Sequence, residues 1–164
     1  MALAGKVSAV LNLVETLTGD LENARAAIDQ NLGWTIADGT GVNQANLVWS
    51  DTRTLGSGAN EDLDVSGALA GLTGAKVFVK VKSILVMAAA ANTVSVTVSR
   101  PAANGLPFFS AASDAVVLPP GGIFLLVNPS AAGIAVTAGT GDLINILAGA
   151  ASSVYSIVII GTNA

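Results

Sequence analysis

The sequence predicts an all-β body, an antiparallel sandwich, preceded by an N-terminal α-helical segment. From residue 44 to the end, short apolar segments of strand length alternate with turns that contain Gly or Pro. Before them, apolar residues recur at spacings of three and four, which is the period of a helix. We therefore expect a helical segment over residues 1–32, a linker over 33–43 and a β-sandwich domain over 44–164.

The helical prediction depends on an apolar seam with heptad spacing. Its a and d positions hold Leu3, Val7, Val10, Val14, Leu17, Leu21, Ala24 and Ile28. A lone amphipathic helix is marginal in water and needs a partner face. The helix could lie on its own β body, associate with other copies, most simply three, or dock on another protein. We expect these eight residues to serve oligomerisation or docking.

Nine strand segments are predicted in the body. They are residues 45–49, 63–65, 77–87, 93–99, 116–118, 122–127, 134–137, 143–147 and 154–160. This number and spacing indicate a jelly-roll-like arrangement of two sheets. Residues 155–160 carry no charge and would aggregate at an exposed edge, so we expect them in a central strand.

The composition argues against most chemistry. The chain is 52% hydrophobic and 11% charged, where about 25% charged is usual, so copies or partners should cover much of its exterior. It has neither Cys nor His, which removes thiol chemistry and the commonest general base and metal ligand. A net charge of −4 disfavours nucleic-acid binding, and no apolar run reaches the length of a membrane span. We expect no catalytic residue, cofactor or metal.

Several ordered blocks within residues 39–161 resemble a family. They are residues 39–55 (GTGVNQANLVWSDTRTL), 61–65 (EDLDV), 88–93 (AAAANT), 119–126 (PPGGIFLL), 135–143 (AVTAGTGDL) and 157–161 (IVIIG). Together they resemble a small virion structural protein encoded by tailed bacteriophages. The N-terminal segment lies outside the resemblance.

The resemblance implies a component of the phage particle and not an enzyme. The leading hypothesis is a cement or decoration protein that stabilises the head shell, and the alternative is a tail fibre, spike or baseplate component. The implied partners are the protein itself, as a homotrimer, and the major capsid protein or other virion proteins, with no nucleic acid and no membrane. The implied location is the virion, assembled in the bacterial host cytoplasm. A third hypothesis is a carbohydrate-binding module, for which the chain has few aromatic residues.

A few residues outside the seam are candidate partner contacts. Trp34 could anchor a partner or pack locally, and Phe108 and Phe109 could meet a neighbouring subunit or fold over the sandwich. In residues 77–82, alternation places the valines on one face and Lys80 and Lys82 on the other, where they could steer docking or be solvated.

The densest acidic segment is residues 60–64. It lacks the glycine-hinged loop of common calcium sites, and pairing of its carboxylates with Arg53 or a lysine is the simpler expectation.

Overall fold

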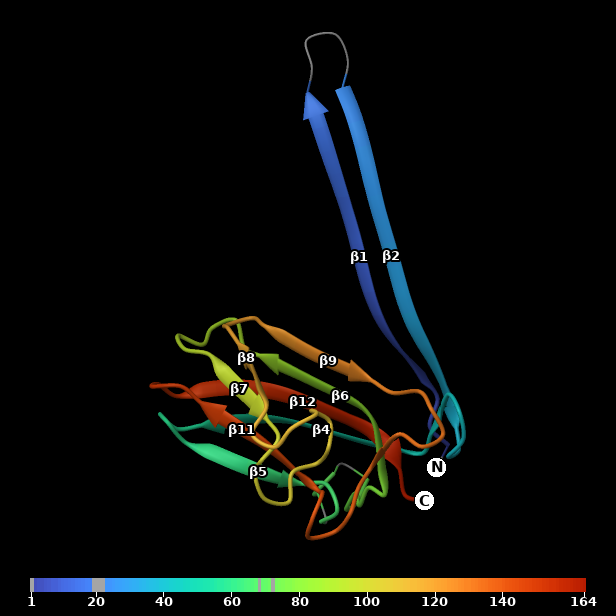
Figure 1. The fold of residues 1–164 in the computed structure, drawn as a ribbon, viewed down its shortest axis with the longest axis vertical. Helices are drawn as coiled ribbons and strands as arrows, with labels where there is room; N and C mark the ends of the chain where they lie inside the picture. The colour runs from blue at the N-terminus through green and yellow to red at the C-terminus, as the bar shows by residue number, and fades with distance from the viewer. Residues whose placement is uncertain (1, 19–22, 68, 72) are drawn as a thin grey trace.

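The protein is an all-β structure in which a long hairpin projects from a two-layered body (Figure 1). This computed structural model describes residues 2–18, 23–67, 69–71 and 73–164. Its strands are β1 (Gly5–Thr18), β2 (Asn23–Asp38), β3 (Gln44–Ala45), β4 (Leu47–Leu55), β5 (Asn60–Asp64), β6 (Lys80–Ala88), β7 (Val96–Ser99), β8 (Ala115–Leu118), β9 (Ile123–Val127), β10 (Ile134–Ala135), β11 (Leu143–Ala148) and β12 (Ser153–Thr162). The predicted β-sandwich is confirmed.

The body consists of two antiparallel sheets. In the first, β12 lies between β4 and β6, and both β9 and β10 pair with the other edge of β6. The second sheet has the order β5-β11-β7-β8. Every predicted strand segment overlaps one of these strands, and the prediction that residues 155–160 form a central strand is confirmed.

The core lies between the two sheets and follows from the alternation of each strand. In β12, Tyr155, Ile157 and Ile159 are fully buried, while the residues between them are half-buried on the outer side. Val96 and Val98 of β7 face them from the second sheet and are also fully buried. The apolar period of two in these segments therefore selects one inner face for each sheet.

The predicted helix over residues 2–32 is wrong. Residues Gly5 to Thr18 instead pair antiparallel with Asn23 to Ile36, so the segment is a hairpin. Helix and strand periods coincide here, because Val7 and Val14 fit a heptad while Val7, Ala9, Leu11 and Leu13 fit a period of two. Branched side chains, including three valines and two threonines in β1, favour the extended form.

The predicted linker over residues 33–43 is also largely strand. β2 continues to Asp38, and the end of β2 pairs in parallel with β3. The hairpin therefore joins the body through a short sheet and not through a linker. The predicted boundary between the segments at residue 32 falls inside β2.

Replacing Gly161 should destabilise the fold. The register between β12 and β6 shifts at Ile160/Gly161, and a Cβ on Gly161 would lie 2.1 Å from the carbonyl oxygen of Lys80. We expect Gly161→Ala to lower the free energy of unfolding by about 2–3 kcal/mol, because the backbone must move to admit the methyl group. Gly5→Ala, which would meet nothing within 4 Å, is the control in the same urea titrations. Equal losses in the two variants would contradict this account of the bulge.

Candidate functional site

The hairpin has one apolar face and one mixed face. In the register of β1 and β2, Leu13 pairs with Ile28 and Ala9 with Leu32, while Asn12 pairs with Asp29 and Thr16 with Arg25. Successive residues point to opposite faces, so the two sets separate. We call the first set the apolar face, because most of its residues are apolar; its described members are Val7, Ala9, Leu11, Leu13, Glu15, Ala26, Ile28, Gln30, Leu32 and Trp34. The mixed face holds Val10, Asn12, Val14, Thr16, Arg25, Ala27, Asp29 and Asn31.

The base of the hairpin is fixed to the body by a small second core. Trp34, Ile36 and Ala45 are buried together, and Leu3, Val7, Val127 and Ile160 pack against them. The backbone N–H of Leu3 also donates to Asp38 at 3.0 Å. Since Val127 and Ile160 belong to the first sheet, this cluster sets the direction in which the hairpin leaves the body.

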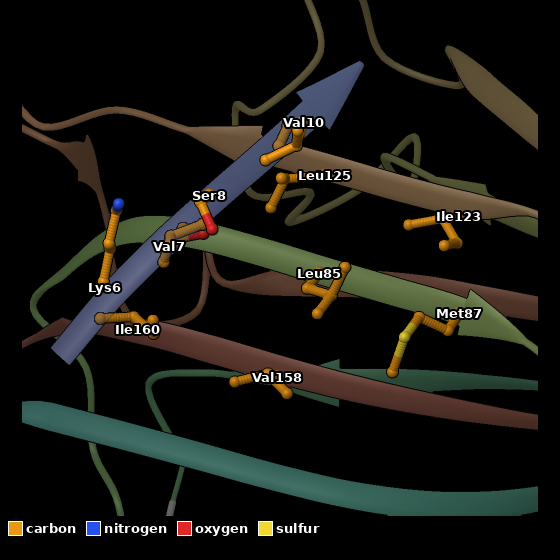
Figure 2. A pocket seen from close by; sticks show the side chains of 12 residues that line it. Lys6, Val7, Ser8, Val10, Leu85, Met87, Ile123, Leu125, Val158 and Ile160 are labelled. Carbon is orange, nitrogen blue, oxygen red and sulfur yellow. The ribbon is translucent and has the colours of Figure 1, made fainter. Parts of the chain in front are cut away.

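Beyond this base, β1 crosses the outer face of the first sheet and leaves an apolar groove of about 650 Å³. Figure 2 shows Val7 and Val10 of β1 over the sheet, with Leu125 beneath and with Met87 and Ile123 farther along the same face. Ile123 is 64% exposed, and Leu85, Leu125 and Val158 are half-buried. The groove is thus half covered by the hairpin of its own chain.

The remainder of the hairpin, formed by residues 11–18 of β1 and 23–30 of β2, extends away from the body (Figure 1). We call this part the arm. Its described side chains, those of residues 11–16 and 25–30, are all exposed, and Leu11, Leu13 and Ile28 are each half accessible to water. A two-stranded hairpin without further cover is marginal in water. The arm is therefore the candidate site for contact with another molecule.

The residues of the predicted seam do not form one stripe. Val7 and Leu3 lie in the small core at the base, and Ile28 lies on the apolar face of the arm. Val10 and Val14 lie on the opposite, mixed face. Leu17 and Ala24 pair with each other in the hairpin backbone, and Leu21 lies outside the described residues. The eight predicted seam residues leave out Leu11, Leu13 and Leu32, which a period of two selects for the apolar face.

Trp34 packs within its own chain. Its side chain is 6% exposed, and its Nε1 has no hydrogen-bond partner among the described residues. This burial leaves the ring no free surface with which to anchor another protein. The two interpretations of Trp34 are an anchor for a partner and local packing, and the structure shows local packing.

Alternation predicts that Lys82 lies on an exposed face beside Lys80. In the structure its side chain is fully buried instead. Lys82 occupies the extra position in β6 where the register with β12 shifts. Its Nζ donates to the carbonyl oxygens of Gly41 and Thr40, at 2.5 and 3.4 Å. Burial, with a smaller contribution from Lys80, lowers the pKa of Lys82. Lys82 thus holds the turn between β2 and β3, whereas Lys80 remains partly exposed.

Phe108 and Phe109 form an aromatic cluster with Phe124 of β9. The ring centroids of Phe108 and Phe109 are 4.5 Å apart, and that of Phe109 lies 5.8 Å from Phe124. Both residues are half-buried, so the loop folds over the edge of the sandwich. Their contact with a neighbouring subunit stays a prediction.

Glu61 is the centre of a polar network on the body. Its two carboxylate oxygens accept hydrogen bonds from the Tyr155 hydroxyl, at 2.6 Å, and from Arg53, which also pairs with Asp51. Burial and the bond to Glu61 raise the pKa of Tyr155, so the phenol stays protonated. Glu61 is thus paired with Arg53, and within the described residues no group of three or more acidic side chains is placed to hold a metal ion.

Comparisons with known proteins do not assign this chain. No protein-family model, curated protein or solved structure matches it. In the part of the chain that the structure describes, no helix is long and apolar enough to cross a membrane.

Replacing Lys82 should loosen the base of the hairpin. Lys82→Met keeps most of the buried stem but leaves the carbonyls of Thr40 and Gly41 without their donor, so we expect a loss of about 1–3 kcal/mol in the free energy of unfolding. Lys80→Met is the control, with an expected change of less than about 0.5 kcal/mol. Urea titrations of both variants at neutral pH make the measurement, and equal losses would contradict the role of Lys82.

The same variant should also change the pH dependence of stability. Because the pKa of Lys82 is lowered in the folded state, the unfolded chain binds more protons between that pKa and the ordinary value of about 10.4. The stability that Lys82 contributes therefore rises with pH through this window. Relative to Lys80→Met, we expect Lys82→Met to lack that rise in urea titrations at increasing pH.

Proposed function

We propose that this protein is a structural subunit of the virion of a tailed bacteriophage, and specifically a cement or decoration protein of the head. The observation that carries the proposal is the arm, which presents exposed apolar side chains away from a well-packed body. Such an arm suits a subunit that stabilises an assembly by joining other subunits.

The arrangement of the body supports the proposal. Setting aside β10, the eight body strands form sheets of order β4-β12-β6-β9 and β5-β11-β7-β8. The chain passes from one sheet to the other at most connections, as in two interlocked Greek keys. We therefore assign the body to the jelly-roll architecture, which is common among viral capsid proteins.

The mechanism we propose is stabilisation by binding. A protein that binds only the assembled state of a shell shifts the equilibrium toward that state, by an amount set by its concentration and dissociation constant. The arm and the outer face of the first sheet supply apolar surface, which favours association roughly in proportion to the area removed from water. The small core around Trp34 holds the arm in a fixed direction, and this lowers the entropy cost of docking.

The number of copies in each virion tests the location. A cement or decoration role requires hundreds of copies, matched to the sites of the head lattice, in quantitative mass spectrometry of purified virions from the phage that encodes the chain. A few to a few dozen copies would instead support the tail fibre, spike or baseplate alternative. Absence from purified virions would contradict both.

Removing the arm should separate folding from assembly. Val10 and Asn31 face each other in the hairpin, so residues 11–30 can be replaced by an Asn-Gly turn without disturbing the small core at the base. We expect this variant to keep the unfolding transition of the body and to lose binding to virions depleted of the protein, measured by co-sedimentation.

The control is a full-length chain carrying Asn12→Ser, a polar replacement on the mixed face of the arm. It should bind depleted virions as the parent protein does. Full binding by the shortened variant would contradict the role that we assign to the arm.

A further inference from the structure

The chain carries two apolar surfaces that it cannot bring together by itself. One is the apolar face of the arm, and the other is the uncovered part of the outer face of the first sheet, around Met87 and Ile123. Figure 1 shows the arm pointing away from the body, so it does not reach this part of its own sheet. We propose that the arm of one copy lies across the outer sheet face of a second copy of this chain. This inference rests on the proposed structural role and specifies the partner.

The contact within one chain provides the pattern for the contact between chains. At the base of the hairpin, Val7 and Trp34 of the apolar face already pack against Val127 and Ile160 of the first sheet. The apolar face continues outward through Leu11, Leu13 and Ile28, and its polar members in the described part of the arm are Gln30 and Glu15. The sheet face likewise continues along the groove, away from the base of the hairpin, to Met87 and Ile123, as Figure 2 shows. The apolar face of the arm thus extends the hairpin side of the contact at the base, and the sheet face around Met87 and Ile123 extends its sheet side.

Charge selects which face of the arm docks. The apolar face carries Glu15 as the charged residue within the described part of the arm, whereas the mixed face carries Arg25 and Asp29. Among the described residues that line the groove, the charged one is Lys6. Docking through the apolar face therefore buries fewer charges than docking through the mixed face. Docking through the mixed face would bury an Arg and an Asp against apolar side chains, which is costly.

The face of the arm is large enough for an interface at the small end of the specific range. Eight residues at about 3.4 Å each and two strands, each about 4.8 Å wide, give the arm a face of roughly 260 Å² in projection. Each copy gives one arm and accepts one, so a closed dimer in which both arm faces are fully covered buries about 1,000 Å², near the lower limit of specific interfaces. The arm-to-sheet contact joins two different surfaces, so it can also repeat head to tail around a ring. A ring of three copies can therefore form through the same contact.

Cross-linking between single-cysteine variants tests the contact, because the chain has no cysteine of its own. Leu13→Cys and Ile123→Cys chains are mixed and treated with a short bis-maleimide, so that any link between the two variants joins different copies. We expect a Leu13–Ile123 link. Two controls are matched for exposure. Val14 follows Leu13 in β1 but lies on the mixed face, and the two side chains are equally exposed, at 51%. Val117 lies on the second sheet, and its exposed fraction of 61% is similar to the 64% of Ile123.

Links of equal yield from Val14→Cys or Val117→Cys would overturn the proposal. A link between two Leu13→Cys chains, with none to Ile123→Cys, would also overturn it, because the arms would then cover each other. The parent protein must also self-associate in sedimentation velocity. A monomer at every concentration would overturn the proposal as well.

A charge on the accepting surface gives an independent measurement. We expect Ile123→Glu to raise the dissociation constant of self-association about a hundredfold, because it places an unpaired charge against the docked arm. Val117→Glu should leave it within about threefold. Both positions are exposed in the single chain, so neither change should affect folding, which urea titration checks.

Binding to depleted virions is scored separately in the same variants. If Ile123→Glu is monomeric and still binds virions, the inference holds and self-association is not needed for attachment. If the parent protein self-associates through these surfaces but never binds virions, the inference holds and the proposed function fails.

Discussion

The small core at the base of the hairpin determines the rest of this structure's external form. Trp34, Ile36 and Ala45 are buried against two residues of the first sheet, and this contact decides where β1 crosses the sheet and where it leaves it. Both the half-covered groove and the projecting arm follow from that crossing. Lys82 strengthens the same region, because its ammonium group holds the turn that connects β2 to β3. A buried cation here stabilises only because carbonyl oxygens replace its lost water.

The body could be predicted from sequence and the hairpin could not, for a physical reason. Body strands such as residues 93–99 alternate strictly and are bounded by Gly or Pro, so a single period fits them. In residues 7–14 apolar side chains are so frequent that both the helical and the extended period find matches. The branched residues of β1 and the Gly19-Asp20 pair, a common hairpin-turn dipeptide, were the available signals. Lys82 was misplaced because a bulge interrupts alternation, and no local pattern in this sequence marks it.

The first sheet differs from an ordinary sandwich sheet because much of its outer face, along β6 and β9, is apolar, while β4 presents Ser50, Thr52 and Thr54. Antiparallel sheets of this kind usually pack one face on the core and expose a polar face to water. Here β6 and β12 alternate between fully buried residues and half-buried ones such as Leu85 and Val158, with little polar surface between them. The low charge of the whole chain has the same origin. Many of the apolar residues that are not buried in the core lie on the outer face of the first sheet and on the arm.

An exposed apolar arm is a hazard as well as a means of assembly. Both edges of the arm have unpaired backbone groups, and such edges favour uncontrolled pairing between chains. Its mixed face, with Arg25, Asp29 and Asn12, limits stacking of arms on one another through both sides. Only one face is then free for burial, and a surface of matching character lies on the same molecule's sheet. The restriction of apolar residues largely to one side therefore favours a defined contact of limited size over open-ended aggregation.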